Sequence, residues 1–364
     1  MRAAILDAIG SALSVQNIDI EGPRAGEALI RVKACGVCHS DYSCMHGILK
    51  APVPSVLGHE MAGIVEAVGP GVENVKKGDH VVAGPSPHCG VCEFCVESKP
   101  YLCTQMAPMF INATMLDGTS RLSRRGEIVY QLCGIAGFAE QAVVPAGALV
   151  KVDPGVPLEA VCVLGCGIMT GVGAVMNTAK VERGTTVAVL GCGGVGLAVI
   201  QAARIAGARQ IIAVDPVASR RALAVRLGAT DEVDPSGGDV VKLVKKLSGG
   251  GVHYGFECIG RTDTIAQVFN MVRPSGTAVA VGAPKITDEV GIRASGFLQD
   301  KSLKGSLYGA SSPRRDIPRM IEWYRSGDLR LDEIVTHQIP LADINEAFTL
   351  MTSGGGARAV VMMG

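Results

Sequence analysis

A glycine-rich turn between an apolar strand and an apolar helix constrains the fold of this chain more than any other feature. The run VAVLGCGGVG (187–196) places Gly191, Gly193 and Gly196 in a G-x-G-x-x-G pattern. The first glycine allows a tight turn, the second a close approach of a pyrophosphate, and the third close packing of the helix on the sheet. The free N–H groups and the positive dipole end at the helix start favour a phosphate. A dinucleotide-binding site is therefore predicted here.

Strand and helix patterns alternate after about residue 165, which predicts a parallel, doubly wound sheet. Asp215 ends the second predicted strand and follows Gly196 by 19 residues. A carboxylate at that place binds both ribose hydroxyls and repels a 2′-phosphate, so NAD is predicted rather than NADP. Arg220 is near enough in sequence to reach the same ribose and to allow some use of NADP. The predicted strands are 185–191, 211–215, 253–260 and 277–283, and the predicted helices are 194–208, 219–229, 237–250 and 262–276.

The part of the chain before residue 165 has a different pattern. Short β-rich runs, such as 28–34 and 62–68, alternate with Gly/Pro turns. This pattern predicts a twisted, antiparallel, barrel-like domain with long loops. A chain of 364 residues is long enough for two domains. We expect boundaries near 166/167 and 307/308, with the mixed segment 308–364 returning to the first domain.

Charge and hydropathy exclude several classes of protein. Lys+Arg and Asp+Glu both number 34, so no net field favours nucleic acid or an anionic membrane. The start MRAAILDAIG lacks the features of a secretion or transit signal. No apolar run approaches the roughly 18 residues of a membrane span. A soluble, cytoplasmic protein that binds neither nucleic acid nor a membrane is expected.

Four cysteines with the spacing C-x2-C-x2-C-x7-C lie in the segment from Pro87 to Cys103. A reducing compartment disfavours a disulfide knot, and the spacing differs from that of ferredoxin clusters. Four thiolates from one compact loop fit tetrahedral zinc with no ligand position left open, which is the pattern of a structural site. We therefore predict a structural zinc lobe at about 87–105. Its ligands would be Cys89, Cys92, Cys95 and Cys103.

A second group of candidate ligands is spread over three segments. ACGVCHSDYSCMHG (34–47), VLGHEMAG (56–63) and VLGCGIMTGVGA (163–174) together hold Cys35, Cys38, His39, Cys44, His46, His59, Glu60 and Cys166. Taken alone, each is more often an ordinary packed residue. Two thiolates and one imidazole, however, leave the fourth position of a zinc ion open for water or substrate, as in catalytic sites. The residues alone do not decide which of these side chains converge.

Over essentially its whole length the chain resembles the zinc-dependent medium-chain alcohol dehydrogenases. The resemblance rests on CGVCHSD, GHEMAG, the four-cysteine lobe, GCGIMTG, GCGGVG and THQIPLADINEAF. It implies an α/β protein with a GroES-like β-barrel catalytic domain (1–166), a Rossmann domain (167–307) and an active site in the cleft between them. It also implies reversible hydride transfer between a primary alcohol or aldehyde and NAD, with two Zn²⁺ per chain. A homodimer or homotetramer is implied, with a dimer edge strand near Lys301–Gly309.

The resemblance also assigns site residues by position. The catalytic zinc ligands would be Cys38, His59 and Cys166, supported by Asp41 and Glu60. Ser40 would be the first group of a proton relay, since a hydroxyl both donates and accepts. The implied cofactor contacts are His39 (to the pyrophosphate), Thr170, Gly191, Gly193, Gly194, Val195, Gly196, Asp215, Arg220, Ile259, Val281, Ala283, Leu307 and Arg358.

The chain departs from the family pattern at two places. Ser43 stands where relays of the animal type often have a histidine, so the proton would leave through ribose hydroxyls and water, or through His46. Pro85 stands where many relatives carry a bulky aromatic residue against the substrate. With Leu132 and Cys133 as the other expected pocket residues, we expect a bulky apolar primary alcohol, benzylic or allylic, rather than ethanol.

The stretch LDGTSRLSRRGEIV (116–129) is similar to the longer-loop branch of the family, which includes animal-type, formaldehyde and aryl or allylic alcohol dehydrogenases. A thiol-dependent formaldehyde dehydrogenase is therefore an alternative. It would need cationic groups at the pocket mouth, for which Arg121, Arg124 and Arg125 are the nearby candidates. We favour a solvated loop face for these three arginines. A catalytically inactive nucleotide-binding relative is the remote alternative.

Overall fold

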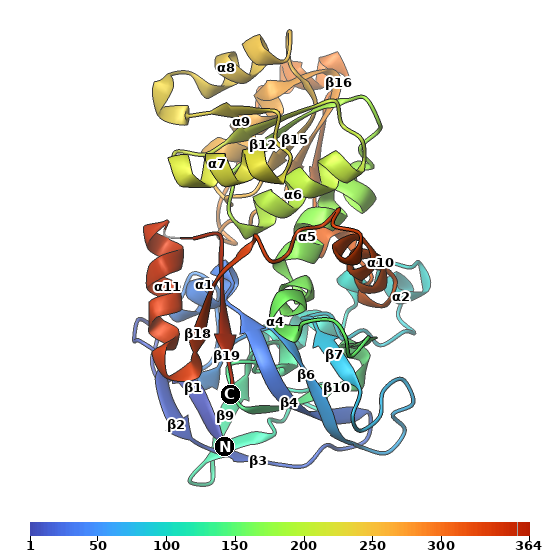
Figure 1. The fold of residues 1–364 in the computed structure, drawn as a ribbon, viewed down its shortest axis with the longest axis vertical. Coiled ribbons are helices and arrows are strands. Elements are labelled where there is room, and N and C mark those ends of the chain that lie inside the picture. The colour runs from blue at the N-terminus through green and yellow to red at the C-terminus, as the bar shows by residue number, and fades with distance from the viewer. Residues whose placement is uncertain (355) are drawn as a thin grey trace. The chain divides into compact units, whose positions relative to one another are not determined.

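The computed structural model describes residues 1–354 and 356–364, and the chain forms two compact units. Unit 1 comprises Met1–Gly167, Ser312–Glu322 and Leu331–Gly364, and unit 2 comprises Ile168–Ser311 and Trp323–Arg330. Both termini belong to unit 1 (Figure 1). The expected boundaries at 166/167 and 307/308 differ from these by one and four residues, and the expectation did not include the return of 323–330 to unit 2.

Hydrogen bonds within unit 2 explain why residues 323–330 belong to it. The N–H of Arg330 donates to Gln201 Oε1 at 2.7 Å, and Arg330 Nη1 donates to the carbonyl of Arg226 at 3.1 Å. Arg204 donates to the carbonyl of Asp328. Gln201 is fully buried, so its side-chain carbonyl needs such a partner.

Unit 1 is built on two mostly antiparallel sheets. One has the order β2-β1-β5-β9-β8-β3, and the other has the order β11-β7-β6-β4-β19-β18, with β10 also paired to β4. The pairs β5–β9 and β18–β19 are parallel, which the antiparallel expectation did not include. The bounds of the first sheet are β1 (Arg2–Leu6), β2 (Ser14–Asn17), β3 (Asp19–Ile20), β5 (Ser55–Val56), β8 (Leu122–Arg124) and β9 (Glu127–Gln131). Those of the second are β4 (Glu27–Gly36), β6 (Glu60–Val68), β7 (His80–Ala83), β10 (Gln141–Pro145), β11 (Leu149–Val152), β18 (Val335–Pro340) and β19 (Arg358–Met362).

Strand register in the second sheet brings two sequence motifs together. Strands β4 and β6 are antiparallel, and Gly36 at the end of β4 lies opposite Glu60 at the start of β6. The chain that leaves β4 toward Cys38 therefore runs beside the chain that enters β6 from His59. The helices of this unit are α1 (His39–Met45), α2 (Glu93–Val96), α3 (Met106–Asn112), α4 (Leu158–Val161) and α11 (Ile344–Ser353), and α10 (Pro313–Arg325) begins in it. Helix α11 packs on β18 and β19 (Figure 1).

Unit 2 has the parallel sheet expected of a Rossmann domain. Its order is β14-β13-β12-β15-β16-β17, and every neighbouring pair is parallel. The strands are β12 (Thr186–Leu190), β13 (Gln210–Val214), β14 (Asp231–Val233), β15 (Val252–Glu257), β16 (Val272–Ala280) and β17 (Ser302–Gly305). The helices are α5 (Gly167–Gly173), followed by a π-helix (Ala174–Ala179), then α6 (Gly194–Ile205), α7 (Ala218–Leu227), α8 (Val240–Leu247) and α9 (Thr262–Met271). The α/β prediction is confirmed. The sequence pattern missed β14 and extended α9 into residues that begin β16.

The strand β12 shows why the pattern was readable. Its five residues are all buried, as expected of a central parallel strand covered on both faces. Helices α6 and α7 pack against each other, as do α8 and α9 (Figure 1).

In the part of the chain that the structure describes, no single helix is long and apolar enough to cross a membrane. The bent pair Leu158–Gly165 and Gly167–Ala179 together meet the length and composition of a span.

Candidate active site and metal centres

Four ligand-type side chains from three separate segments of unit 1 meet in one cluster. The ligand atoms of Cys38, His59, Glu60 and Cys166 all lie within 4.8 Å of one another. The first three side chains are buried and that of Cys166 is half-buried. The structure thus brings together the three side chains that the resemblance assigns to a catalytic zinc, with the Glu60 carboxylate as a fourth.

Asp41 fixes two of these segments relative to each other. Its Oδ2 accepts a hydrogen bond from the Cys38 N–H at 3.0 Å, and its Oδ1 accepts one from the Gly58 N–H at 3.0 Å. The same Oδ1 lies 3.1 Å from His59 Nδ1, and the Asp41 side chain is fully buried. A carboxylate at Nδ1 holds the ring proton there and leaves Nε2 as the nitrogen with a free lone pair.

Glu60 is paired with Arg358, which lies 298 residues later in the chain. Glu60 Oε1 accepts from the Gly167 N–H at 2.9 Å and from Arg358 Nη2, and both side chains are buried. Burial raises the pKa of Glu60 to about 8, although the Arg358 charge opposes the shift. The resemblance assigned Arg358 to the cofactor, and its pairing with Glu60 was not foreseen.

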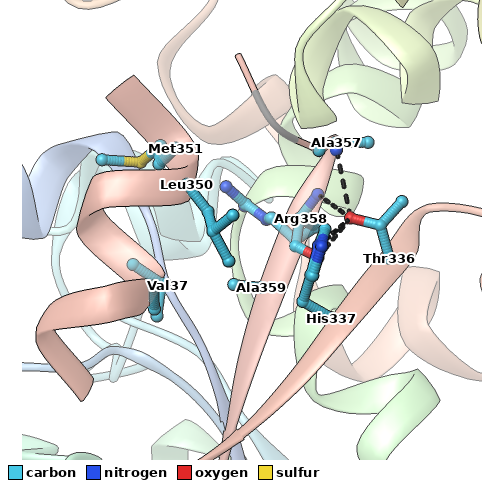
Figure 2. A pocket seen from close by; sticks show the side chains of 10 residues that line it. Val37, Thr336, His337, Leu350, Met351, Ala357, Arg358 and Ala359 are labelled. Atoms are coloured by element: carbon cyan, nitrogen blue, oxygen red, sulfur yellow. Dashed lines mark hydrogen bonds between the residues drawn. The ribbon is translucent and has the colours of Figure 1, made fainter. Parts of the chain in front are cut away.

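Hydrogen bonds to the Thr336 side chain hold the backbone of Arg358 at the start of β19. Thr336 Oγ1 accepts from the N–H groups of Ala357 at 3.2 Å and Arg358 at 3.4 Å (Figure 2). The hollow drawn there is lined by Val37, Thr336, His337, Ala347, Leu350, Met351, Gly356, Ala357, Arg358 and Ala359. Its enclosed space holds about one water molecule. This hollow is therefore too small for an organic substrate.

The side chains of the cluster shift one another's pKa values. A hydrogen bond from Cys166 lowers the pKa of Cys38 well below that of a free thiol, and the same interaction raises the pKa of Cys166. Burial alone would lower the pKa of His59, but the charges of Asp41 and the two thiols outweigh it and raise the pKa. Two sulfurs and one imidazole nitrogen form a donor set that suits zinc, while the Glu60 carboxylate is paired with Arg358. A divalent ion bound there would lower all four pKa values.

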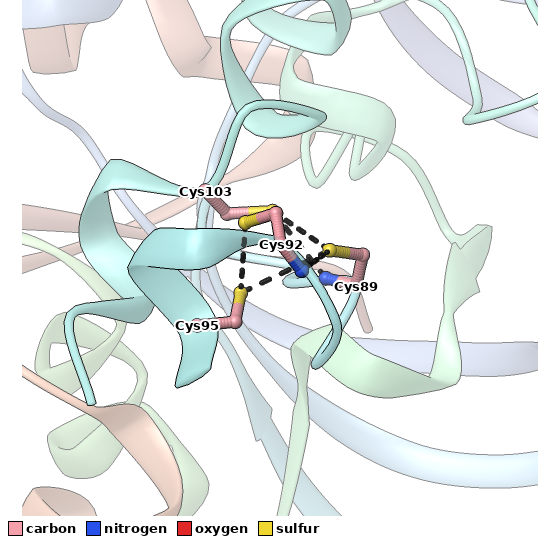
Figure 3. Close-up of side chains that lie close together, drawn as sticks. All are labelled: Cys89, Cys92, Cys95 and Cys103. Atoms are coloured by element: carbon pink, nitrogen blue, oxygen red, sulfur yellow. Dashed lines mark hydrogen bonds between the residues drawn. The ribbon is translucent and has the colours of Figure 1, made fainter. Parts of the chain in front are cut away.

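The four cysteines of the predicted lobe also converge (Figure 3). The Sγ–Sγ distances are 3.5 Å for Cys92–Cys95, 3.6 Å for Cys89–Cys103 and 3.9 Å for Cys89–Cys95. A tetrahedral ion with Zn–S bonds of about 2.3 Å separates its sulfurs by about 3.8 Å, so the lobe fits zinc. Backbone N–H groups of Cys89 and Cys92 donate to Cys103 Sγ and Cys89 Sγ. Four sulfurs fill a tetrahedral site completely.

The glycine turn of unit 2 is shaped to receive a phosphate. Gly191 has φ +91°, and a Cβ on Gly196 would overlap the Gly191 carbonyl, so both positions require glycine. Nothing lies within 4 Å of where a Cβ on Gly193 would point, so the backbone there is open. No side chain caps α6, whose N-terminus begins at this turn. These features fit the pyrophosphate of a dinucleotide.

Asp215 is held by two backbone groups of unit 2. Its Oδ2 accepts from the Cys192 N–H and its Oδ1 from the Val217 N–H, each at 2.8 Å. The carboxylate therefore connects the glycine turn with the loop after β13. The other expected cofactor residues of this unit are Thr170 on α5, Gly194 and Val195 on α6, Arg220 on α7, and Ile259, Val281, Ala283 and Leu307 in the segments that follow β15, β16 and β17.

The expected relay residues lie around α1. Ser40 Oγ lies 3.7 Å from Cys38 Sγ, and Ser43 Oγ lies 3.5 Å from His39 Nδ1. His46 is exposed, stacks on the Tyr42 ring at 4.0 Å and lies 3.0 Å from the Tyr42 carbonyl through Nδ1. His46 thus contacts Tyr42, while Ser40 contacts the metal cluster.

The expected pocket residues have different degrees of burial. Leu132 and Cys133 are buried, and Pro85 is half-buried. Burial raises the pKa of the Cys133 thiol to about 12, with the His59 charge opposing the shift. Cys133 is therefore a neutral, apolar group near the cluster. Its φ of 58° is unusual for a non-glycine residue, and such backbones are often found at functional sites.

The interpretation of the three arginines as a solvated face is wrong for Arg121. Its side chain is 1% exposed and donates to Glu27 Oε1 at 2.5 Å and Oε2 at 2.9 Å, and to Asp117 at 2.7 Å. Arg124 is half-buried and pairs with Asp7 at 2.7 Å. Arg125 is exposed. A cation in a buried ion pair requires a partner, which here is an acid 94 residues away and invisible to local patterns.

Comparisons with known proteins agree with this geometry. The sequence matches the alcohol dehydrogenase GroES-like domain over residues 24–154 and the zinc-binding dehydrogenase family over residues 194–326. It is 41% identical to the S-(hydroxymethyl)glutathione dehydrogenase of Haemophilus influenzae, over 99% of this chain and 96% of that protein. It is 37% identical to alcohol dehydrogenase 1 of Trifolium repens, over 100% of this chain and 97% of that protein. The chain belongs to the zinc-binding alcohol dehydrogenase family.

A solved structure extends the likeness to the fold. The benzyl alcohol dehydrogenase of Acinetobacter calcoaceticus matches with a TM-score of 0.95 and 32% identity, over 100% of this chain and 99% of that chain. The predicted family, its GroES-like and Rossmann domains and its zinc dependence are thus confirmed.

For this alcohol dehydrogenase family member, sequence reasoning missed the Glu60–Arg358 pair and the buried Glu257. Glu257 ends β15 as an acid at a strand end, the same signal that singled out Asp215 after β13.

Proposed function

We propose that this protein is an NAD-dependent alcohol dehydrogenase that interconverts a primary alcohol and its aldehyde. The observation that carries the proposal is the convergence of Cys38 and His59, both buried, with the half-buried Cys166. Two thiols and one imidazole leave one position of a tetrahedral ion for substrate. The open glycine turn followed by Asp215 supports a nicotinamide dinucleotide as the second reactant.

Each residue of the cluster has a separate task in this proposal. Cys38, His59 and Cys166 would hold the catalytic zinc, and Asp41 would keep the His59 proton on Nδ1. When bound, zinc and NAD supply a Lewis acid that lowers the pKa of the alcohol hydroxyl and an acceptor for the hydride. Ser40 would take the hydroxyl proton, since its Oγ lies next to Cys38. His46 has no part in the proposed relay, because it contacts Tyr42.

We further propose a bulky apolar alcohol, benzylic or allylic, as the substrate. Buried Leu132 and Cys133 and the small Pro85 support an apolar, roomy pocket. The likeness to a benzyl alcohol dehydrogenase points the same way. The test is kcat/KM for ethanol, benzyl alcohol and an allylic terpenoid alcohol, each with NAD and with NADP. We expect kcat/KM to be at least about 10-fold higher for benzyl alcohol than for ethanol. We also expect it to be at least about 10-fold higher with NAD than with NADP. Preference for ethanol would reject the pocket proposal.

A thiol-dependent formaldehyde dehydrogenase is the second candidate, supported by the relative named S-(hydroxymethyl)glutathione dehydrogenase. That activity would need cationic groups to bind the carboxylates of glutathione. Arg121 and Arg124 are already paired with acidic groups of the chain, which counts against the candidate. Formaldehyde oxidation measured with and without glutathione separates the two functions. Stimulation of more than about 100-fold by glutathione, with benzyl alcohol a poor substrate, would favour the second candidate.

Homo-oligomer formation and a cytoplasmic location complete the proposal. Strand β17 is an edge of the sheet, and edge strands offer unpaired backbone groups to another chain. Ile286, Phe297 and Leu298 in the same part of unit 2 are exposed by 88%, 51% and 89%. We expect light scattering to give the mass of a dimer or tetramer. All twelve cysteines are free thiols, which suits a reducing compartment.

A further inference from the structure

Glu257 at the end of β15 is a buried carboxylate that accepts several hydrogen bonds from one loop. Its Oε1 accepts from the N–H groups of Ile259 at 2.9 Å and Gly260 at 2.8 Å, and from Thr264 Oγ1 at 2.8 Å. The Arg261 N–H is at 3.5 Å from the same oxygen. The side chain is fully buried in unit 2. One oxygen thus fixes the backbone of the turn between β15 and α9.

The backbone of Glu257 fixes a second loop. Its carbonyl accepts from the N–H groups of Val281 and Gly282, each at 2.9 Å, in the turn after β16. The two turns are packed backbone to backbone. A Cβ on Gly260 would lie 2.6 Å from the Ala283 carbonyl, and a Cβ on Gly282 would overlap the Gly260 backbone. Glu257 is therefore the common anchor of both turns.

These two turns lie against the glycine turn. A Cβ on Gly191 would lie 2.7 Å from the side chain of Ile259, so that side chain packs on the first glycine of the G-x-G-x-x-G pattern. Ile259 is nevertheless 43% exposed, and Ala283 is exposed. The anchored turns thus present apolar side chains to solvent beside the proposed pyrophosphate site. A shift of the turns would move these side chains relative to Gly191.

The Glu257 side chain lies next to the start of helix α9. Helix α9 begins after Arg261, whose side chain does not cap it. A carboxylate that accepts N–H groups of the residues just before this start is favoured by the helix dipole. Glu257 Oε2 is buried and has no hydrogen-bond partner, so the residue is not optimised for stability alone.

We propose that Glu257 is a positioning residue for the nicotinamide cofactor. It acts through the turns 258–261 and 281–283, which it holds against the glycine turn, and it does not itself touch the cofactor. The inference rests on the proposed use of NAD and adds a residue that neither the glycine pattern nor Asp215 includes. Loosening the turns weakens the binding of the cofactor more than the binding of the alcohol or of the metal.

The test compares Glu257→Gln and Glu257→Asp in the zinc-loaded enzyme. Glutamine keeps an acceptor oxygen at the same distance, whereas aspartate is one methylene too short to reach the Ile259 and Gly260 N–H groups. NADH fluorescence titration should show the dissociation constant raised about 10-fold or more for aspartate and about 3-fold or less for glutamine. Hydrogen exchange of the amides of 258–261 and 281–283 should speed up in the same order. KM for NAD should follow the dissociation constant, while KM for alcohol and the zinc content stay unchanged.

The matched controls are Glu289→Gln and Glu289→Asp, because Glu289 is an exposed acid of the same unit. They should behave as wild type in every assay. The inference is overturned if the Glu257 variants bind NADH as wild type does, or if KM for alcohol and zinc content change as much as NADH affinity. A wild-type protein that binds neither NADH nor NADPH would contradict the proposed function instead. Hydrogen exchange would then still decide whether Glu257 anchors the turns.

Discussion

The two metal clusters of unit 1 use cysteine thiols as ligands but are assembled in opposite ways. Cys89, Cys92, Cys95 and Cys103 come from one short segment, and the donors to their sulfurs include backbone N–H groups of the same segment. Cys38, His59 and Cys166 come from three segments, and Asp41 holds two of these segments in place. The lobe cysteines are mostly half-buried, whereas Cys38 and His59 are buried.

This difference separates a site that maintains a loop from a site that performs a reaction. Four thiols complete a tetrahedral ion and leave nothing for a substrate, whereas three ligands leave one position. The open cluster depends on groups that do not bind the ion, because such groups orient the metal ligands. Asp41 and the Glu60–Arg358 pair supply that support. The predictions below each break one cluster and run from the largest expected effect to the smallest.

Removal of Cys166 should abolish activity. Cys166→Ala deletes one of the three ligands, so the catalytic ion is lost or misplaced, and we expect kcat/KM to fall at least about 10³-fold. The matched control is Cys162→Ala, which removes a fully buried thiol four residues earlier that lies outside the cluster. It should retain activity within about 3-fold. Equal losses in both variants would show that the effect is one of packing.

Arg358→Met should destabilise the enzyme because it leaves the Glu60 carboxylate buried without its cation. Breaking a buried pair on one side costs about 3–5 kcal/mol, which denaturant unfolding would measure. The double variant Glu60→Gln/Arg358→Met should recover part of that loss. The exposed pair Arg2–Glu140, at 2.7 Å, is the control, and Arg2→Met should cost less than about 1 kcal/mol. If the double variant lost as much free energy of unfolding as Glu60→Gln and Arg358→Met lose together, Glu60 and Arg358 would not be coupled.

Asp41→Asn should weaken the open cluster without changing its ligands. The asparagine side chain carries no charge, so it holds the Nδ1 proton of His59 less strongly. We expect metal affinity at this cluster to fall about 10–100-fold, measured by competition with a zinc chelator. Asp19→Asn, at an exposed position of unit 1, should bind metal as wild type does. If Asp41→Asn also did so, Asp41 would have no part in metal binding.

Cys92→Ser should have the smallest effect on turnover. It breaks the closed cluster, so the lobe at 87–105 should lose its ion and become sensitive to protease. Turnover of the folded enzyme should stay within about 3-fold, because no residue of the lobe contacts substrate in this account. Val91→Ser is the control, since Val91 is 79% exposed and contributes no ligand. A 100-fold loss of turnover with the lobe intact would reverse the roles assigned to the two clusters.

The same contrast explains how much could be predicted from the sequence. The lobe and the glycine turn were readable because all their residues lie in one short segment. The open cluster needed the resemblance to a family, because Cys166 lies 107 residues after His59 and no local pattern joins them. Arg121 was misread because its partner Glu27 is 94 residues away. The Glu60–Arg358 pair depends on register and burial, which appear only when the chain is folded, whereas Glu257 carried a strand-end signal that was overlooked. Short β14 had too few residues to give a pattern.

Anomalous X-ray scattering at the zinc edge, from crystals of the enzyme, tests the central claim most directly. The account predicts two peaks in each chain. One should lie at about 2.3 Å from all four lobe sulfurs. The other should lie within bonding distance of Cys38 Sγ, His59 Nε2 and Cys166 Sγ, with a fourth ligand that is not part of the protein. A single peak at the lobe, or a second ion enclosed by four protein ligands, would contradict it.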